Sequence, residues 1–283
     1  MAPFDPSRHD PAAEDERDLR QGRGRTHNPS NGEEEENGHG AAEQRIVRVI
    51  KPVIFSDDAP GQLDKKYVNS RFYSAFNYSL LSGRGTDPGM SLGITSPNPA
   101  EGKTVVASNL ALSLALTHQK ETVLVDLNIR RPRLHSIFGT KIGPGLIESL
   151  NGESVIVHKT SVKHLAVLAS GDIRKGGFDK ERFVQLAETS PKDGGRSEVR
   201  LEHVAAFRDV IYSLREVFHY VIIDMPSLTM ADSPAMLTSQ MDGLFVVIDV
   251  RRTKLADVEK MFRRVNEQLV QGFVFNRTPE DVT

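Results

Sequence analysis

The sequence predicts an α/β fold of three layers, in which helices cover both faces of a mostly parallel central sheet. From Gly89 onward, short runs rich in Val, Ile and Leu alternate with longer segments of helical character. Turn residues bound each apolar run, as expected for strands buried on both faces. Strands are predicted at 91–96, 122–126, 164–169, 219–224, 243–250 and 271–275, and helices at 103–117, 131–138, 144–150, 180–188, 200–217, 232–240 and 254–269.

The residues before the sheet divide into two parts. Residues 1–44 are polar and include the acidic run Glu33–Glu36, so burial cannot offset the entropy lost on ordering them. We predict a disordered tail there, with a regulatory or partner-binding tail as the alternative. Residues 45–88 contain an apolar stretch expected to lie along the domain as an extended arm, Ile46–Phe55, followed by a helical segment, Lys66–Leu81. The domain itself is predicted over 89–283.

The first strand leads into a loop typical of a phosphate site, Ile94–Thr104 (ITSPNPAEGKT). The loop ends where an apolar helix begins, and amide groups at a helix start favour a bound anion. Lys103 would place a positive charge beside the outer phosphates, and the Thr104 hydroxyl would ligate a magnesium ion. Pro97 and Ala100 stand where glycine is common. The alternative is therefore an ordinary capped helix start.

Two further strands each end in an acid. Thr122–Asp126 (TVLVD) delivers Asp126 to the carboxyl edge of the sheet, where it could accept a proton from an attacking hydroxyl group. The alternative for Asp126 is a cap on the next helix. Tyr220–Asp224 (YVIID) delivers Asp224, which would hold the magnesium ion through water or through Thr104.

Other polar residues at strand ends carry weaker signals. Asn276 closes the last strand and could pair with an adenine edge, although an Asn in this position is usually a turn former. One Arg of the cluster that includes Arg130 could reach a phosphate or a neighbouring subunit, or it could simply be solvated. The histidines have no metal-ligand spacing.

Composition excludes several classes of protein. The chain has 283 residues and a formal net charge of −2, which argues against a nucleic-acid partner. It contains no cysteine, which excludes disulfides and thiolate catalysis and fits the cytosol. We find no secretory signal and no apolar stretch long enough to span a membrane. If the protein works at a membrane, another chain is expected to hold it there.

The motifs together resemble the cytoplasmic domain of the bacterial tyrosine kinases (BY-kinases) and their capsular and exopolysaccharide relatives. The family's phosphate loop, written ITSxxPGEGKT, is similar to Ile94–Thr104, and its VLLIDADLRRPxLHxxFG is similar to VLVDLNIRRPRLHSIFG at Val123–Gly139. The resemblance continues in GLxxxLxGE, FDYVIIDTPP, VDGxxLVVxxxxT and GxVxN, at Gly145–Glu153, Phe218–Ser227, Met241–Thr253 and Gly272–Asn276. The related MinD and ParA ATPases carry an extra lysine where this chain has Asn98.

This resemblance implies a P-loop NTPase fold that binds ATP and Mg²⁺. It implies Lys103, Asp126 and Asp224 as catalytic residues, and Thr104, Asp126 and Asp224 around the metal. The expected nucleotide-binding residues are Pro99, Ala100, Glu101, Gly102, Lys103, Thr104, Val105, Asn128, Arg130 and Asn276. It further implies a membrane-anchored polysaccharide copolymerase as partner, a possible homo-oligomer, and a cytoplasmic location at the inner face of the plasma membrane.

The chain departs from the family pattern at four places. Asn128 replaces a second Asp near the metal, and Ala100 replaces a glycine that could need a positive φ. No tyrosine follows Tyr220, so phosphorylation of a tyrosine-rich tail is not expected. The oligomerising helix written ExxRxxR in the family lacks its charge pairing here, with Arg71, Ser74 and Asn77 in those places.

Three functions are compatible with these residues. The first is an ATP-dependent protein tyrosine kinase or ATPase that regulates polymer synthesis and export, as intact Lys103, Thr104, Asp126 and Asp224 indicate. The second is a nucleotide-responsive scaffold with weak or lost turnover, which the departures favour. The third is a positioning ATPase that cycles between monomer and dimer, which Asn98 disfavours.

Overall fold

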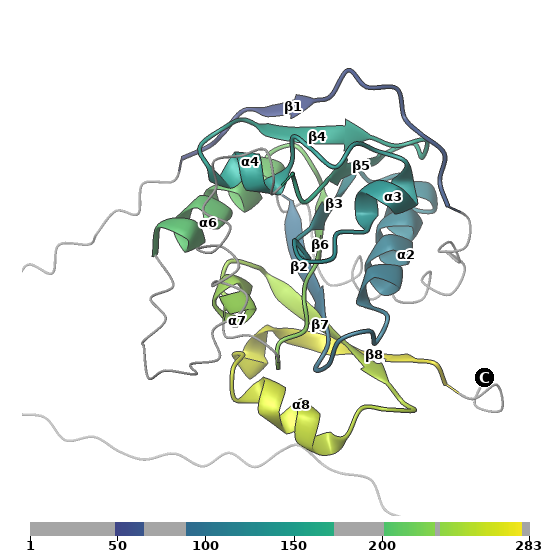
Figure 1. Cartoon of the computed structure of the whole chain (residues 1–283), viewed down its shortest axis with the longest axis vertical. Helices are drawn as coiled ribbons and strands as arrows, with labels where there is room; N and C mark the ends of the chain where they lie inside the picture. Colours follow the sequence, from purple (N-terminus) through teal and green to yellow (C-terminus); the bar gives the residue numbers. More distant parts are fainter. Residues whose placement is uncertain (1–48, 65–88, 173–200, 230–232, 279–283) are drawn as a thin grey trace, which may run out of the picture. The chain divides into compact units, whose positions relative to one another are not determined.

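An eight-stranded sheet forms the centre of the protein (Figure 1). The computed structural model describes residues 49–64, 89–172, 201–229 and 233–278, all within one compact unit, Val47–Thr283. The predicted tail at 1–44 and the predicted helices at 66–81 and 180–188 lie outside these described residues. The strands are β1 Val53–Phe55, β2 Met90–Thr95, β3 Thr122–Asp126, β4 Val155–Lys159, β5 Leu165–Leu168, β6 Tyr220–Asp224, β7 Gly243–Asp249 and β8 Val270–Asn276.

The sheet is mostly parallel, as the alternation of strands and helices predicts. Its spatial order is β1-β4-β5-β3-β6-β2-β7-β8, and the pairs from β5 to β8 are all parallel. Only β4 pairs antiparallel with its neighbour β5, and β1 pairs parallel with β4. The carboxyl ends of β3, β6 and β2 therefore meet at one edge, which is where parallel sheets place their ligands.

Helices cover both faces of the sheet. Side chains at alternate strand positions enter two apolar clusters, so that Val123 and Val125 of β3 face one cluster and Leu124 faces the other. The first cluster includes side chains of α4 (Leu146–Leu150), α6 (Leu201–Arg215), α7 (Ser233–Thr238) and α8 (Leu255–Phe262), and the second includes side chains of α2 (Lys103–Leu116) and α3 (Leu134–Phe138). Figure 1 shows the two groups of helices on opposite sides of the sheet. The predicted three-layer sandwich is confirmed.

Six α-helices lie in the described residues: α2 Lys103–Leu116, α3 Leu134–Phe138, α4 Leu146–Leu150, α6 Leu201–Arg215, α7 Ser233–Thr238 and α8 Leu255–Phe262. The single predicted helix over 254–269 is wrong in its second half, where a separate 3₁₀-helix spans Glu267–Leu269. Asn266 has an extended backbone (φ −65°, ψ 116°), and its side chain accepts a hydrogen bond from the Gln268 amide. This local bond competes with continuation of the helix.

Two strands were not predicted. The extended arm expected at 46–55 contains β1, which pairs with β4 from Val53 opposite Val155 onward. β4 itself ends in His158 and Lys159, so its short sequence shows no clear alternation of apolar and polar residues. These two strands extend the sheet on the side away from β2. Within the described residues, no helix has both the length and the apolarity required to cross a membrane.

The helix α2 offers a matched test of the packing. Leu114 is fully buried in the cluster beneath α2, whereas Leu116 in the same helix is 51% exposed. We expect Leu114→Ala to lower the free energy of unfolding by about 2–5 kcal/mol, because it removes buried methyl groups and leaves a cavity. Leu116→Ala should change it by about 0.5 kcal/mol or less. Denaturant unfolding of both variants measures the difference, and equal losses would contradict this packing.

Candidate phosphate-binding site

The loop between β2 and α2 leaves the start of the helix open. Gly102 is the N-cap residue of α2, has a φ of 99°, and makes no side-chain cap. A Cβ atom at this position would lie 2.2 Å from Asn276 Nδ2, so glycine is required. The first amides of an α-helix have no acceptor inside the helix, and the helix dipole adds to their attraction for an anion. The predicted phosphate loop therefore has the geometry of an anion site.

Ala100, which stands where the family pattern has a glycine, adopts a left-handed backbone conformation. Its φ is 62°, in the left-handed region that an L-residue enters at a cost of about 1–2 kcal/mol. The side chain is exposed, so no packing is seen to compensate for this strain. The loop geometry is thus kept, at a cost in stability.

Lys103 lies at the first position of α2 with its side chain turned into the protein. It is 7% exposed, and its Nζ donates a 2.9 Å hydrogen bond to Ser96 Oγ at the other end of the loop. Burial lowers the pKa of Lys103, and the carboxylates of Asp224 and Glu101 oppose this shift. The side chain is therefore held across the loop by Ser96, with its charge near the carboxylates of Asp224 and Glu101.

Thr104 and Asp224 form the predicted metal side of the site. Thr104 Oγ1 donates a 2.7 Å hydrogen bond to Asp224 Oδ2. The second oxygen of Asp224, Oδ1, is buried and has no hydrogen-bond partner among the described residues. A buried carboxylate oxygen without a partner is costly unless a ligand completes it. Mg²⁺ needs only one or two protein oxygens beside waters and phosphates, so a hydroxyl and this carboxylate fit it.

Asp126 lies beside Asp224 on the neighbouring strand, and the two residues are register partners in the β3–β6 pair. Asp126 is fully buried, and it accepts three backbone hydrogen bonds. Its Oδ1 accepts from the Asn128 amide at 3.1 Å, and its Oδ2 accepts from the Arg133 and Leu134 amides at 3.0 and 3.1 Å. It therefore caps the start of α3, which the sequence left open as the alternative. With this cap in place, α3 begins at Leu134, three residues after the start predicted at residue 131.

The two acids share one electrostatic environment. Burial raises the pKa of Asp126 to about 6, although its three backbone hydrogen bonds lower the pKa in part. Burial, together with the nearby charge of Asp126, raises the pKa of Asp224 to about 7, although the Thr104 hydrogen bond and the charge of Lys103 lower it in part. Perturbed carboxyl groups of this kind are common where a cation or a proton is handled.

The other predicted residues lie around the same edge. Asn276 donates from Nδ2 to the Glu101 carbonyl oxygen at 2.8 Å, and its Oδ1 accepts from the Arg277 amide. The first of these bonds links Asn276 to the phosphate loop. Pairing of Asn276 with an adenine edge stays a prediction. Pro99 and Arg130 are exposed, Val105 is 37% exposed in the first turn of α2, and Asn128 is half-buried.

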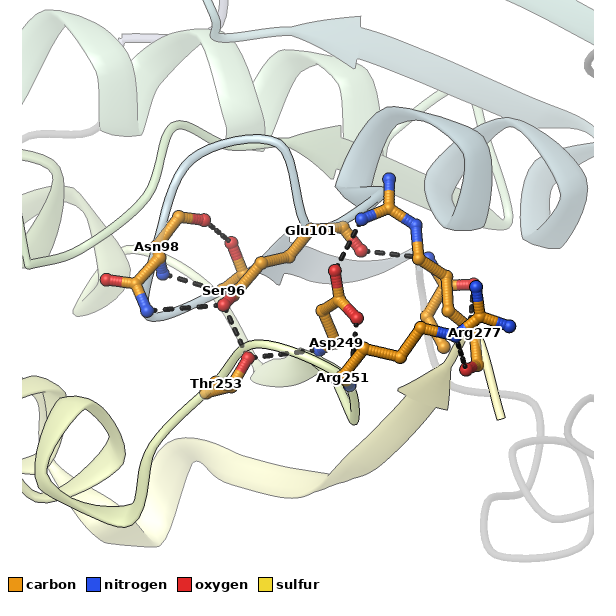
Figure 2. A network of polar contacts seen from close by, with 8 residues as sticks. Ser96, Asn98, Glu101, Asp249, Arg251, Thr253 and Arg277 are labelled. Carbon is orange, nitrogen blue, oxygen red and sulfur yellow. Dashed lines mark hydrogen bonds and ion pairs between the residues drawn. The ribbon is translucent and has the colours of Figure 1, made fainter. Parts of the chain in front are cut away.

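The sequence reasoning assigned no role to the residues that surround Glu101. Figure 2 shows Glu101 in a polar network with Asn98 and Thr253, next to the ion pair between Asp249 and Arg277. Thr253 Oγ1 donates to Glu101 Oε1 at 2.5 Å and accepts from the Asp249 amide at 3.1 Å. Thr253 closes one of the family-like motifs, but nothing in that motif indicates a contact 152 residues away in sequence.

Comparisons with known proteins find tyrosine-protein kinases among the similar chains. No family model matches the chain. The chain is 28% identical over 192 residues to the tyrosine-protein kinase CpsD of Streptococcus pneumoniae serotype 4, covering 66% of this chain and 75% of CpsD. It is 27% identical over 206 residues to the tyrosine-protein kinase ptk of Acinetobacter johnsonii. That match covers 72% of this chain and 25% of ptk, so the chain spans about a quarter of that relative.

Solved structures lead to the same family. The kinase domain of VpsO superposes with a TM-score of 0.57 at 26% identity, covering 74% of this chain and 94% of that domain. The kinase domain of the Escherichia coli tyrosine kinase ETK shares the fold, with a TM-score of 0.55 at 17% identity. The predicted P-loop kinase fold and the resemblance to bacterial tyrosine kinases are confirmed.

Ala100 generates a test of the strain in the loop. We expect Ala100→Gly to raise the free energy of unfolding by about 0.5–1 kcal/mol. Relief of the left-handed strain of about 1–2 kcal/mol exceeds the entropy of about 0.4–1 kcal/mol that glycine adds to the unfolded chain. Ala100→Ser keeps the Cβ atom and should bring no gain. Urea unfolding measures both, and a loss of stability in Ala100→Gly would count against strain at this position.

The acid pair generates a test of pH dependence. The pKa of Asp224 is higher in the folded protein than in the unfolded chain, so its contribution is present below about pH 4 and lost as pH rises towards about 7. In EDTA, we expect unfolding free energy to fall over this range. Asp224→Asn should make this pH-dependent decrease in the free energy of unfolding smaller. At pH 8, the free energy of unfolding of the variant should be higher than that of the parent protein.

Glu216→Gln, at an exposed position just beyond α6, should leave that pH dependence unchanged and serves as the control. Denaturant unfolding at several pH values between 4 and 8 gives the curves. Parallel curves for the parent protein and Asp224→Asn would show that the Asp224 carboxyl group is not destabilised by burial.

Proposed function

Because the chain is a relative of the bacterial tyrosine kinases of capsule and exopolysaccharide systems, we propose that it binds ATP with Mg²⁺ and transfers phosphoryl groups to protein tyrosines. One observation carries the proposal. The buried Asp224 carboxylate, with an oxygen that lacks a partner, adjoins Thr104 at a helix start that has no side-chain cap. An anion at the helix start and a cation at the carboxylate would complete both groups at once.

Each residue of the loop has a part in this chemistry. The amides of the first turn of α2 would bind the β-phosphate, and Lys103 would neutralise charge that develops on the outer phosphates. Thr104 and Asp224 would hold Mg²⁺, which supplies charge stabilisation across the phosphates when it is bound. Pro99 to Gly102 and Val105 would line the phosphates, with Asn128, Arg130 and Asn276 nearby.

Asp126 is the proposed base. Its carboxylate lies at the carboxyl end of β3 beside Asp224, and a pKa of about 6 suits a group that accepts a proton near neutral pH. The three hydrogen bonds that this carboxylate accepts from backbone amides hold it in place and favour its ionised form. Capping α3 and accepting a proton are compatible, because a carboxylate has more lone pairs than these three bonds use.

A second function is a nucleotide-responsive scaffold with weak or no turnover. Two observations favour it over an efficient enzyme. Asn128 supplies no carboxylate beside the acid pair, and Ala100 holds the loop under strain. Both functions use the same nucleotide site and differ only in whether phosphoryl transfer follows binding.

The proposed setting is the regulation of polysaccharide polymerisation and export. We propose that a membrane-anchored copolymerase holds the protein at the cytoplasmic face of the plasma membrane, and that copies of the chain associate with one another. The family resemblance supports this setting. A nucleic-acid partner is not proposed, because the net charge of −2 provides no excess of positive charge.

The activity test compares two variants with the parent protein. With labelled ATP and Mg²⁺, we expect label on tyrosine, and Asp126→Asn should reduce its rate by about 10²–10⁴-fold because the base is lost. Asn also caps helices, so this variant should fold and should bind nucleotide within a few-fold of the parent. Lys103→Met should weaken both binding and transfer, because it removes the charge that faces the phosphates.

The control is Lys141→Met. It removes an exposed lysine that is not one of the predicted site residues and that pairs with Asp58. This variant should change neither nucleotide binding nor the rate of phosphoryl transfer. Nucleotide binding without turnover identifies the scaffold, and release of phosphate without labelled protein identifies an ATPase. Absence of binding to MgATP and MgADP by folded protein overturns the proposal.

A further inference from the structure

Glu101 is a buried carboxylate that follows two exposed residues of the phosphate loop, Pro99 and Ala100. It is 1% exposed, and Asn98 and Thr253 supply its hydrogen bonds. Among the described residues, no lysine or arginine forms an ion pair with it. A buried carboxylate is costly unless hydrogen bonds satisfy it, so these bonds have to persist in the folded protein.

The carboxylate closes the strained turn of the loop. Glu101 Oε2 accepts a 3.0 Å hydrogen bond from the Asn98 backbone amide, and Oε1 lies 3.3 Å from Asn98 Nδ2. Ala100, with its φ of 62°, lies inside the turn that this bond closes. The bond therefore opposes relaxation of Ala100 to a negative φ, which would separate residues 98 and 101.

Contacts outside the loop hold the carboxylate in turn. Thr253, in the turn between β7 and α8, donates to Glu101 Oε1 at 2.5 Å. Asn98 Nδ2 also donates to Asp257 in the first turn of α8 at 3.0 Å. Asn276, at the end of β8, donates to the Glu101 carbonyl oxygen at 2.8 Å. The loop is thus attached through one residue to the carboxyl ends of β7 and β8 (Figure 2).

We propose that Glu101 and Thr253 are positioning residues of the phosphate loop, which together keep Ala100 in the left-handed conformation that directs the first amides of α2 at the phosphates. The inference rests on the proposed nucleotide site and deepens it. Neither side chain touches the nucleotide in this proposal, and Glu101 lines the phosphates through its backbone alone. Thr253 holds the Glu101 carboxylate, the carboxylate closes the turn, and the turn sets the direction of the amides.

The same contacts explain how the chain tolerates an alanine at position 100. A glycine would adopt a positive φ without strain, and the loop would then need less support from β7. Removing the Thr253 hydroxyl should therefore weaken nucleotide binding clearly in the parent protein. It should weaken binding only slightly once residue 100 is glycine. This dependence on residue 100 separates positioning from a general loss of stability.

The experiment measures MgADP affinity by calorimetry for Thr253→Val, alone and combined with Ala100→Gly. The matched control is Thr160→Val, because the hydroxyl of Thr160 likewise donates a hydrogen bond, to the Leu165 carbonyl oxygen at 2.9 Å, on the distant β4–β5 side. Thr253→Val should weaken binding about tenfold, since a hydrogen bond to a charged group is lost. Thr160→Val should change the MgADP affinity less than twofold. Adding Ala100→Gly to Thr253→Val should restore most of the affinity that Thr253→Val loses.

A second measurement does not depend on nucleotide. Amide hydrogen exchange of residues 96–106 in nucleotide-free protein should be faster in Thr253→Val than in the parent or in Thr160→Val. Ala100→Gly in the Thr253→Val background should slow it again. Equal exchange in the two threonine variants, or no recovery by Ala100→Gly, overturns the positioning role. Absence of MgADP binding in the parent with faster exchange in Thr253→Val would overturn the proposed function alone.

Discussion

The site depends on three neighbouring parallel strands that end together. β3, β6 and β2 lie side by side in the sheet, so the ends that carry Asp126, Asp224 and the phosphate loop meet at one edge. Register pairing sets Asp126 opposite Asp224, and the 2.7 Å bond from Thr104 joins the start of α2 to the second acid. Strand order thus converts acids 98 residues apart in the chain into one electrostatic unit. Burial raises the pKa of both acids, and the pairing with Asp126 adds to the rise for Asp224.

Such a site stores unfavourable energy in the absence of ligands. Two carboxyl groups are buried beside each other, one of their oxygens lacks a partner, and Ala100 is held at a positive φ. A phosphate at the helix start and a cation at Asp224 would offset these costs, because the phosphate would accept hydrogen bonds from the amides and the cation would balance the buried carboxylates. The protein should therefore be more stable with nucleotide than without it, by an amount set by nucleotide concentration and affinity.

The same features separate the two proposed functions. Asp126 is positioned by three amide groups, which suits a fixed base, but these bonds also make it a good structural cap. Asn128 leaves the metal surroundings with one carboxylate fewer than the family pattern has. In the proposed mechanism, binding would depend on the loop, Thr104 and Asp224, whereas transfer would depend in addition on Asp126 being free to take a proton. Loss of turnover could therefore occur with the nucleotide site intact.

The sequence alone determined the elements and most of the site. Six of the eight strands were predicted to within one or two residues, because strands buried on both faces are continuous apolar runs. Lys103, Thr104, Asp126 and Asp224 were predicted because local spacing places them at strand ends and a helix start, and their roles stay a prediction. Only the tertiary structure decided which groups meet across the sheet. The capping bonds of Asp126, the attachment of Asn276 to the loop, and the contact between Thr253 and Glu101 depend on strand order and register, which short-range patterns do not encode.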